Sequence, residues 1–156
     1  MVRTCDGDEL IEIRAATRAD VHRLAVLCEQ LGYPSTSQQV RQRLDQLLQD
    51  EDQAVFVAEE LGGRVVGWVQ VFGRHLLVVD RHAELGGLVV DEGYRGRSVG
   101  GRLMEQAEDW ARARGCETLY VRSNVVREDA HRFYESIGYD QIKASRVFLK
   151  ELWGTG

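Results

Sequence analysis

The sequence predicts a single α/β (α+β) domain, in which a mixed sheet of about seven strands carries helices on both faces. Apolar segments with helical spacing alternate with short β-branched segments in the order β-α-α-β-β-β-α-β-α-β-β. The chain has 156 residues, enough for one hydrophobic core, and its 44% hydrophobic and 29% charged residues are typical of a globular protein. The rest of the sequence is consistent with this class, element by element.

The first half of the chain predicts one strand, two helices and a hairpin. Residues 10–14 alternate as a strand, and Thr17 begins a helix that Gly32 ends. A second helix follows a run of capping residues, Ser35, Thr36 and Ser37. Residues 54–58 and 65–72 then form the two strands of a hairpin with a glycine-containing turn.

The second half centres on the strand predicted over residues 82–90, which passes through a Gly- and Arg-rich turn into an amphipathic helix. Its Gly86 and Gly87 are typical of a β-bulge or of close approach by another chain or ligand, and tight packing against a helix is the alternative. The remaining predicted elements are a strand over 118–123, a helix over 128–136, and strands over 139–145 and 147–150.

Charge and composition narrow the function. The net charge of −5 has the wrong sign for general nucleic-acid binding and favours cationic partners. The acidic run after the second helix, residues 50–52, is either a solvated loop or a lip that attracts a cationic substrate. The three cysteines and four histidines lack metal-ligand spacing, so no metal is expected.

No membrane span or signal peptide is apparent in the sequence. Apolar runs fall short of the ~20 residues that a span needs. Residues 1–8 are polar, are expected to be flexible, and lack a signal-peptide pattern. We therefore expect a cytoplasmic protein with no membrane partner.

The turn after residue 90 has the composition of a phosphate site. The first N–H groups of a helix have no internal partner and lie at the positive end of its dipole. Glycines let a phosphate approach the backbone, and they are Gly96, Gly100 and Gly101. Positive charge nearby is expected from Arg95, Arg97 and Arg102. The P-loop and dinucleotide patterns do not fit, because no lysine lies near the turn and the glycine spacing differs.

The run Arg95-Gly96-Arg97-Ser98-Val99-Gly100 resembles the Arg/Gln-x-x-Gly-x-Gly/Ala coenzyme A loop of the GNAT superfamily of N-acetyltransferases. Residues 117–124 and 130–139 resemble that family's following segments in the same order and spacing. The resemblance implies a GNAT-like, mostly antiparallel sheet for residues 9–152 and acetyl-CoA as the acetyl donor. Ser98 departs from the family, which has its first loop glycine there.

The resemblance also implies cofactor contacts. The pyrophosphate is expected at the loop residues Arg95, Gly96, Arg97, Ser98, Val99, Gly100 and Gly101. The pantetheine arm is expected along Leu88, Val89 and Val90, beside a splayed neighbouring strand. Asn124 matches a residue that contacts the cofactor or orients the next loop, and a turn-forming role is the alternative.

Acetyl transfer requires a neutral amine, and pH 7 lies about three units below an amine pKa of ~10.4. Glu84 is the candidate general base, with His82 and Asp80 in reserve, and a solvent-facing or ion-paired glutamate is the alternative. By resemblance, Tyr134 points its hydroxyl at the cofactor sulfur and stabilises the departing thiolate, unless it is a core aromatic residue. A backbone N–H within residues 87–89 would hold the oxyanion.

The sequence thus predicts direct acetyl transfer to a small cationic amine, with an aminoglycoside-like acceptor included. A catalytically silent acyl-CoA-binding sensor or interaction module is one alternative, and a protein N-terminal or lysine acetyltransferase is another. A strand edge near the C-terminus could pair with a second copy, which makes a homodimer a further prediction. The segments expected to select the acceptor, residues 32–52 and 74–81, contain no recognisable motif.

Overall fold

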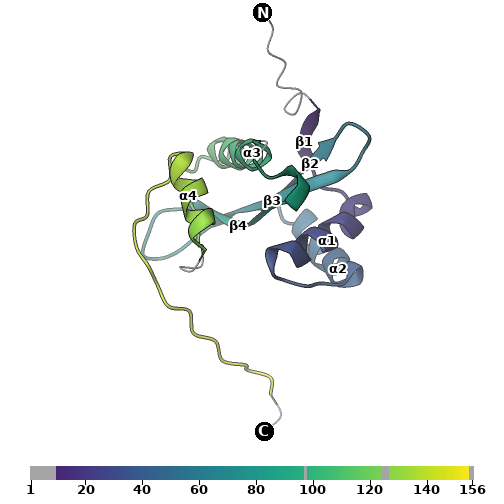
Figure 1. Ribbon diagram of the computed structural model, residues 1–156. Helices are drawn as coiled ribbons and strands as arrows, with labels where there is room; N and C mark the ends of the chain where they lie inside the picture. Colours follow the sequence, from purple (N-terminus) through teal and green to yellow (C-terminus); the bar gives the residue numbers. More distant parts are fainter. Residues whose placement is uncertain (1–9, 97, 124–126, 155–156) are drawn as a thin grey trace, which may run out of the picture. The chain divides into compact units, whose positions relative to one another are not determined.

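The computed structural model describes residues 10–96, 98–123 and 127–154 (Figure 1). Contacts within the chain divide it after Val121 into two units, which are described separately. The first unit contains the sheet and the helices that cover it. The second unit contains a single described α-helix and the C-terminal segment. No helix in these ranges is long and apolar enough to cross a membrane.

A five-stranded sheet forms the centre of the first unit, with its strands in sequence order. The strands are β1 (Ile11–Ala15), β2 (Gln53–Glu60), β3 (Val65–Arg74), β4 (His82–Val90) and β5 (Leu119–Tyr120). Strands β1 to β4 pair antiparallel, and β5 pairs parallel to β4. The parallel pair requires a crossover, which α3 (Val99–Ala113) provides. The predicted mixed, mostly antiparallel sheet is confirmed.

The predicted number of about seven strands is wrong, because the described residues form a sheet of five. The strand expected over residues 118–123 is limited to Leu119 and Tyr120, the two positions that pair with β4. Residues 139–150 are irregular, and in the second unit as described they form no strand pairing. The pattern there suits a strand, but a strand forms only beside an edge that accepts its hydrogen bonds.

The helices begin and end where local chemistry favours it. α1 (Val21–Leu31) ends at Gly32, whose φ of 101° is the left-handed conformation that glycine adopts without strain. α2 (Ser37–Leu48) begins with a capping box, in which Thr36 accepts from the Gln39 N–H and the Gln39 side chain accepts from the Thr36 N–H. α4 (Glu128–Ser136) has the predicted bounds.

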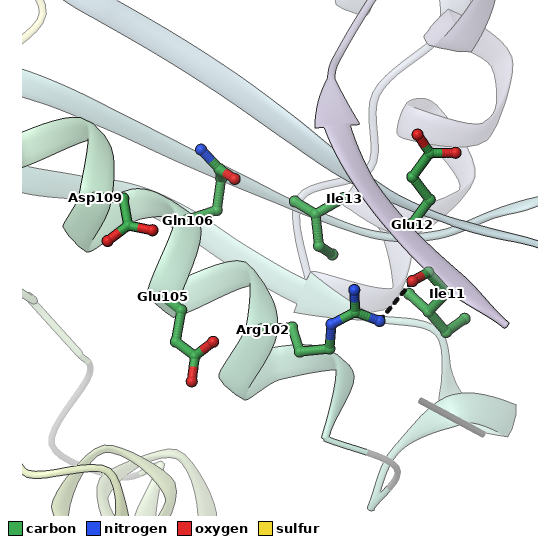
Figure 2. Close-up of a pocket in the computed structure, with 7 residues that line it drawn as sticks. All are labelled: Ile11, Glu12, Ile13, Arg102, Glu105, Gln106 and Asp109. Atoms are coloured by element: carbon green, nitrogen blue, oxygen red, sulfur yellow. Dashed lines mark hydrogen bonds between the residues drawn. The ribbon is translucent and has the colours of Figure 1, made fainter. Parts of the chain in front are cut away.

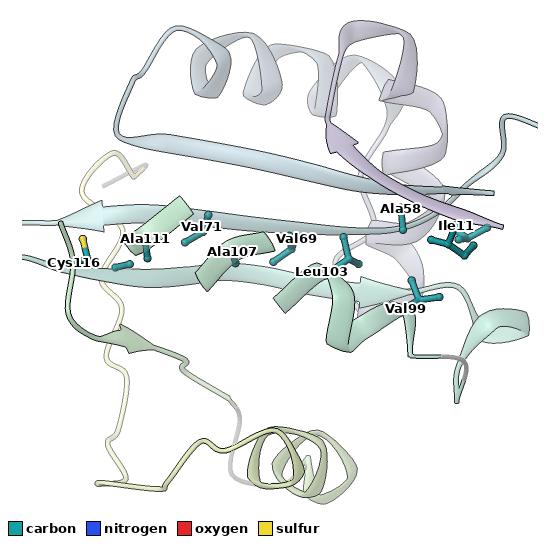
Figure 3. Packing of buried hydrophobic residues seen from close by; sticks show 11 residues of the cluster. Ile11, Ala58, Val69, Val71, Val99, Leu103, Ala107, Ala111 and Cys116 are labelled. Carbon is teal, nitrogen blue, oxygen red and sulfur yellow. The ribbon is translucent and has the colours of Figure 1, made fainter. Parts of the chain in front are cut away.

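Helices cover both faces of the sheet, as predicted. α3 packs on one face, where its Leu103 and Ala107 are fully buried against Val69 and Val71 of β3 (Figure 3). α1 and α2 pack on the other face, through a second cluster that includes Leu27, Leu44 and Val57. Side chains alternate along β3, so Trp68 lies on the α1 and α2 face. The two layers hold β4 between them, with its C-terminal end directed into the turn that precedes α3.

Candidate active site

The double glycine of β4 forms a bulge, as predicted. The β3–β4 register shifts so that Gln70 pairs with Gly87 and Val71 pairs with Leu85, which leaves Gly86 as the extra residue. A Cβ on Gly87 would lie 2.8 Å from the Trp68 ring, and a Cβ on Gly86 would lie 2.6 Å from the Gln70 side chain. The close neighbours are therefore side chains of β3, and the packed indole is the stricter limit on residue size.

Strand β5 accompanies β4 over only two residues. The pairs are Ala83 with Leu119 and Glu84 with Tyr120. Beyond them, residues 85–90 have no strand partner on that side among the described residues. The sequence resemblance implied that this strand is splayed from its neighbour, and the early end of the pairing agrees with that expectation.

Backbone groups of β4 point into this opening at alternate residues. The N–H of Asp91 donates to the Val66 carbonyl at 2.8 Å, so Asp91 directs its backbone toward β3. In an antiparallel strand the direction alternates, so Val89 also faces β3 while Leu88 and Val90 direct their N–H and C=O groups away from it. Of the three predicted pantetheine contacts, Leu88 and Val90 are those whose backbone groups face the opening.

The turn between β4 and α3 leaves room for a bulky ligand. It contains a short 3₁₀ helix, η2 (Glu92–Tyr94), and then Gly96 with a φ of 78°. A Cβ added at Gly93, Gly96 or Gly101 would meet no heavy atom within 4 Å. The side chain of Val99 is buried in the core, so only its backbone N–H can serve a ligand. Open space beside the first N–H groups of α3 fits a pyrophosphate.

Ser98 occupies the N-cap of α3 in the left-handed conformation, with φ 63° and ψ 9°. It is the non-glycine residue with positive φ in the described part of the chain. Left-handed backbone costs an L-residue roughly 1–2 kcal/mol. The family's glycine at this position would avoid that cost, so the departure noted from the sequence has a local energetic consequence.

The arginines expected at the turn are not all there. Arg95 is exposed and its Nε donates to the Val90 carbonyl at 3.2 Å. The expectation for Arg102 is wrong, because its Nη1 donates to the Ile11 carbonyl at 2.5 Å, on β1 (Figure 2). Arg97 and Asn124, both predicted cofactor contacts, lie outside the described residues.

A pocket lies between β1 and α3 (Figure 2). It is lined by Ile11, Glu12, Ile13, Arg102, Glu105, Gln106 and Asp109. Because β1 and β5 are opposite edges of the sheet, this pocket is on the side away from the β4–β5 opening. Arg102 lines it, but none of the described residues predicted to contact the cofactor or to act in catalysis does.

Glu84 is buried in β4 and ion-paired. The residue is 4% exposed, and its carboxylate accepts a hydrogen bond from Arg74 Nη1 at 2.7 Å. The solvent-facing alternative is therefore wrong, Glu84 is ion-paired with Arg74, and its role as the base stays a prediction. His82, two residues earlier on the same face, is 1% exposed, and its ring centroid lies 4.3 Å from that of Tyr120. Asp80 is exposed in the preceding loop.

The His82 ring is bonded on one side only. Its Nδ1 lies 3.1 Å from the Asp80 carbonyl, which a protonated Nδ1 would satisfy. Its Nε2 is buried without a partner among the residues that the structure describes. This contact links the two reserve candidates for the base, of which His82 is buried and Asp80 is exposed.

Asp52 links two loops near this end of the sheet. Its Oδ1 accepts from Arg81 Nη2 at 2.5 Å, and Arg81 Nη1 also donates to the Arg114 carbonyl at 2.7 Å. The acidic run after α2 is therefore not simply a solvated loop, since Asp52 binds the β3–β4 connection. Asp50 and Glu51 are exposed.

Comparison with known proteins identifies the family. The model of the Acetyltransferase (GNAT) family matches residues 18–139. The chain belongs to this family. It is an N-acetyltransferase, and acetyl-CoA is its acetyl donor.

Two curated relatives resemble this GNAT enzyme over most of their length. The aminoalkylphosphonate N-acetyltransferase of Salmonella typhimurium is 34% identical over 143 residues, which cover 90% of this chain and 92% of the relative. The aminoglycoside N(6')-acetyltransferase type 1 of Stenotrophomonas maltophilia is 32% identical over 144 residues, which cover 90% and 93%.

Solved structures share the GNAT fold at lower identity. Aminoglycoside 6'-N-acetyltransferase AAC(6')-IG from Acinetobacter haemolyticus has a TM-score of 0.79 and 19% identity, covering 90% of this chain and 99% of that one. AAC(6')-Iy, solved in complex with the bisubstrate analogue CoA-S-monomethyl-acetylneamine, has a TM-score of 0.80 and 17% identity, covering 90% and 98%.

Tyr134 of the GNAT enzyme lies on α4, in the second unit. Its ring packs edge-on against Phe133 and Tyr139, with centroids 5.2 Å and 6.0 Å away. Burial raises the pKa of the Tyr134 hydroxyl, although the charge of Arg127 opposes the shift. The phenol therefore remains protonated at neutral pH and can donate a hydrogen bond.

The sequence interpretation missed Arg23 and Asp91. Arg23 Nη2 on α1 donates to Asp91 Oδ2 at 2.7 Å, directly before the turn that leads into α3. An Asp two residues before a glycine at a strand end is a turn signal, so the position of Asp91 in Asp91-Glu92-Gly93 could have been noticed. Arg23 gives no such signal, because its partner is 68 residues away in the chain.

The described part of the chain was expected to hold no metal ligands, and its potential ligands are scattered. Among the described residues, no three His, Cys, Asp or Glu side chains lie together as a metal site would require. Cys28 and Cys116 are free thiols, the second of them buried.

Proposed function

We propose that this enzyme transfers the acetyl group of acetyl-CoA directly to the amine of a small cationic acceptor. The observation that carries the proposal is the early end of the β4–β5 pairing, after Glu84 and Tyr120. Unpaired backbone groups of β4 would bind the pantetheine arm of coenzyme A, and the first N–H groups of α3 would bind its pyrophosphate.

The cofactor contacts follow from this surface. The N–H groups of Val99, Gly100 and Gly101 are at the start of α3, where no helical carbonyl precedes them. They would donate to the pyrophosphate, together with the Arg95 and Arg97 side chains and the Gly96 and Ser98 backbone. Leu88 and Val90 would bind the amides of the pantetheine arm, with Val89 between them. Asn124 remains a proposed contact on the strength of its sequence position.

Bound acetyl-CoA supplies the acetyl group as a thioester. The acceptor nitrogen would form a bond to the carbonyl carbon, and the Leu88 N–H would stabilise the oxyanion that results. The carbon–sulfur bond then breaks, and Tyr134 would donate a hydrogen bond to the leaving thiolate. A phenol pKa of ~10 against ~8.5 for a thiol makes hydrogen bonding more favourable than full proton transfer.

Glu84 is the proposed proton acceptor for the substrate ammonium. Bringing an amine of pKa ~10.4 to its neutral form at pH 7 costs about 4–5 kcal/mol, and a placed carboxylate offsets part of this. Arg74 holds the carboxylate in one orientation at 2.7 Å. This pairing favours a positioned base over a freely rotating one.

The two curated relatives are named for two acceptor classes, aminoalkylphosphonates and aminoglycosides. Aminoglycosides carry several ammonium groups, which the net charge of −5 favours. Aminoalkylphosphonates carry one ammonium group and one phosphonate, and the relative named for them is 34% identical. We propose the aminoglycoside-like class first and the aminoalkylphosphonate class as the second candidate.

The deciding experiment is thiol release from acetyl-CoA by the purified protein with aminoglycosides, aminoalkylphosphonates, polyamines, amino acids and short peptides. Release with a single small-amine class supports the proposal and identifies the acceptor. Release with peptides alone would favour a protein N-terminal or lysine acetyltransferase. Coenzyme A binding without release across the panel would favour the silent acyl-CoA-binding module.

We also propose that the enzyme is a homodimer. The C-terminal segment exposes Val147, Phe148, Leu149, Leu152 and Trp153, each at least 84% accessible. Large apolar side chains exposed so close together in the sequence are typical of an interface, and a second copy is the proposed partner. Sedimentation of the full chain and of a variant with Phe148→Ser and Trp153→Ser tests this: a wild-type monomer would contradict it. Cytoplasmic location and the absence of nucleic-acid and membrane partners remain predictions.

A further inference from the structure

The carboxylate of Asp91 links α1 to the turn that leads into the proposed cofactor loop. Asp91 follows the last residue of β4 and is 9% exposed. Its Oδ2 lies 2.7 Å from Arg23 Nη2, and its Oδ1 accepts from the Gly93 N–H at 3.3 Å. One oxygen is therefore bound to a helix and the other to the turn.

Arg23 is itself held in place by the sheet. Its Nε donates to the Val65 carbonyl at 3.0 Å, at the start of β3. The guanidinium is planar and presents its donors in a fixed arrangement, so the bond to Val65 orients the bond to Asp91. Arg23 thus joins β3, α1 and the end of β4 at one point.

The backbone of the turn depends on the same contacts. The Tyr94 N–H donates to the Asp91 carbonyl at 2.8 Å, and the Glu92 N–H donates to Gln30 Oε1 at 3.1 Å. Gln30 lies on α1, two turns after Arg23. Each residue of η2 therefore bonds to Asp91 or to α1, immediately before Arg95 and Gly96.

Electrostatics favour the charged form of this carboxylate. Burial alone would raise the pKa of Asp91, but hydrogen bonds from Arg23 and the Gly93 N–H outweigh it, and the pKa lies below its ordinary value. Asp91 is therefore a carboxylate at neutral pH, close in sequence to a site for an anion. Arg23 offsets that negative charge, and Arg64 lies 3.8 Å away on the same oxygen.

We infer that Arg23 and Asp91 are positioning residues for the pyrophosphate of the donor, with Asp91 holding the turn and Arg23 holding and neutralising Asp91. They touch neither the thioester nor the acceptor in this proposal. The inference rests on the proposed function in one respect, that the loop after Asp91 binds the pyrophosphate.

Donor truncation separates this role from general structural support. S-acetyl-pantetheine carries the thioester and the arm but no pyrophosphate, so a defect confined to pyrophosphate binding does not affect it. In Arg23→Ala the turn should lose its fixed position, so the loop groups that follow it should bind the pyrophosphate less tightly. The coenzyme A Kd, measured by calorimetry, should rise about tenfold. The kcat/KM with S-acetyl-pantetheine should stay within about twofold of wild type.

Two further variants complete the set. Arg23→Lys retains the charge but lacks the second bond, so its coenzyme A Kd should lie between those of wild type and Arg23→Ala. Arg14→Ala is the control. It removes another part-buried arginine–aspartate pair, Arg14 on β1 with Asp20, so the coenzyme A Kd should equal that of wild type. Equal loss with both donors, or a Kd unchanged in Arg23→Ala, would overturn the inference.

Amide hydrogen exchange tests the same assignment without any cofactor. In Arg23→Ala, the amides of residues 92–94 should exchange faster than in wild type, while those of α3 should not change. Unchanged exchange at residues 92–94 would overturn the ordering role of Arg23. A wild-type protein that bound no coenzyme A would instead contradict the proposed function, and the exchange result would still decide the role of the pair in the turn.

Discussion

Arg74 of β3 and Glu84 of β4 are joined diagonally across the sheet, with Arg74 Nη1 2.7 Å from Glu84 Oε2. The register pairs Arg74 with His82 and Glu84 with Phe72, so the long arginine side chain reaches over one cross-strand position. The glutamate side chain is 5% exposed and that of the arginine 35%. Burying a carboxylate without a partner costs folding free energy. The Arg74 guanidinium offsets this cost for Glu84 and fixes the position of its carboxylate.

Replacing Glu84 tests its proposed role as base. Glu84→Gln preserves shape and removes the proton acceptor, so kcat should fall about 100-fold at pH 7. The remaining activity should rise with pH as the free amine becomes available. Thiol release measured from pH 6 to 9 checks both effects.

Glu59→Gln is the matched control for Glu84→Gln. Glu59 is also a strand glutamate paired with an arginine, Arg14, but it lies on β2. Its replacement should leave kcat unchanged. A wild-type kcat at pH 7 in Glu84→Gln would show that Glu84 is not the base, and His82 would be the next candidate.

Tyr134→Phe tests the stabilisation of the leaving thiolate. Loss of one hydrogen bond to a charged sulfur should lower kcat about 10–100-fold while leaving the coenzyme A Kd nearly unchanged. Tyr139→Phe, in the same aromatic group, is the control and should retain wild-type kcat. Full activity in Tyr134→Phe would leave that side chain a core aromatic only.

Gly100→Val tests the loop itself. A β-branched side chain in the first turn of α3 would occupy the space proposed for the pyrophosphate, so the coenzyme A Kd should rise more than about 100-fold. Gly93→Ala is the control, because an added Cβ there meets nothing within 4 Å and Gly93 is outside the proposed contacts. Calorimetry measures both, and undiminished affinity in Gly100→Val would show that the pyrophosphate binds elsewhere.

Ser98→Gly tests the strain at the N-cap of α3. Glycine adopts a φ of 63° freely, so the folded state should gain up to about 1 kcal/mol, reduced by the greater freedom of glycine in the unfolded chain. Urea unfolding compares the variant with wild type. A less stable variant would mean that the serine side chain contributes more than its backbone costs.

Asp20 predicts how stability changes in acid. Burial alone would raise the pKa of Asp20, but hydrogen bonds from Arg14 and the Thr17 N–H outweigh it and lower that pKa. A lowered native pKa adds stability that is present above the unfolded value of about 4 and is lost as the pH falls through the native value.

Asp20→Asn should therefore lower the free energy of unfolding by about 1–3 kcal/mol at pH 7, with a difference from wild type that shrinks below pH ~4. Urea unfolding at a series of pH values measures this. Asp45→Asn, at an exposed pair with Arg18, is the control and should change stability by less than about 1 kcal/mol. A difference that grew toward low pH would contradict the assignment.

Local sequence signals predicted most elements, because their causes are local. Gly32 ends α1 and Thr36 caps α2, since a left-handed glycine and a hydroxyl acceptor act within one turn of their own position. The same reasoning found the bulge at Gly86 and Gly87, where a missing side chain is visible in the sequence itself. It failed for residues 139–150, because pairing of a strand depends on a distant edge.

What the sequence by itself determined is therefore the order of the elements from β1 to α4, the residues that end α1 and cap α2, and the glycine-rich start of α3. The tertiary structure decided which charged side chains meet, and this placed Arg102 on the Ile11 carbonyl, Arg74 on Glu84 and Arg23 on Asp91. The reason is physical: a glycine or a cap acts through neighbouring backbone, whereas a long arginine reaches whichever carboxylate or carbonyl the folded sheet brings within a few ångströms.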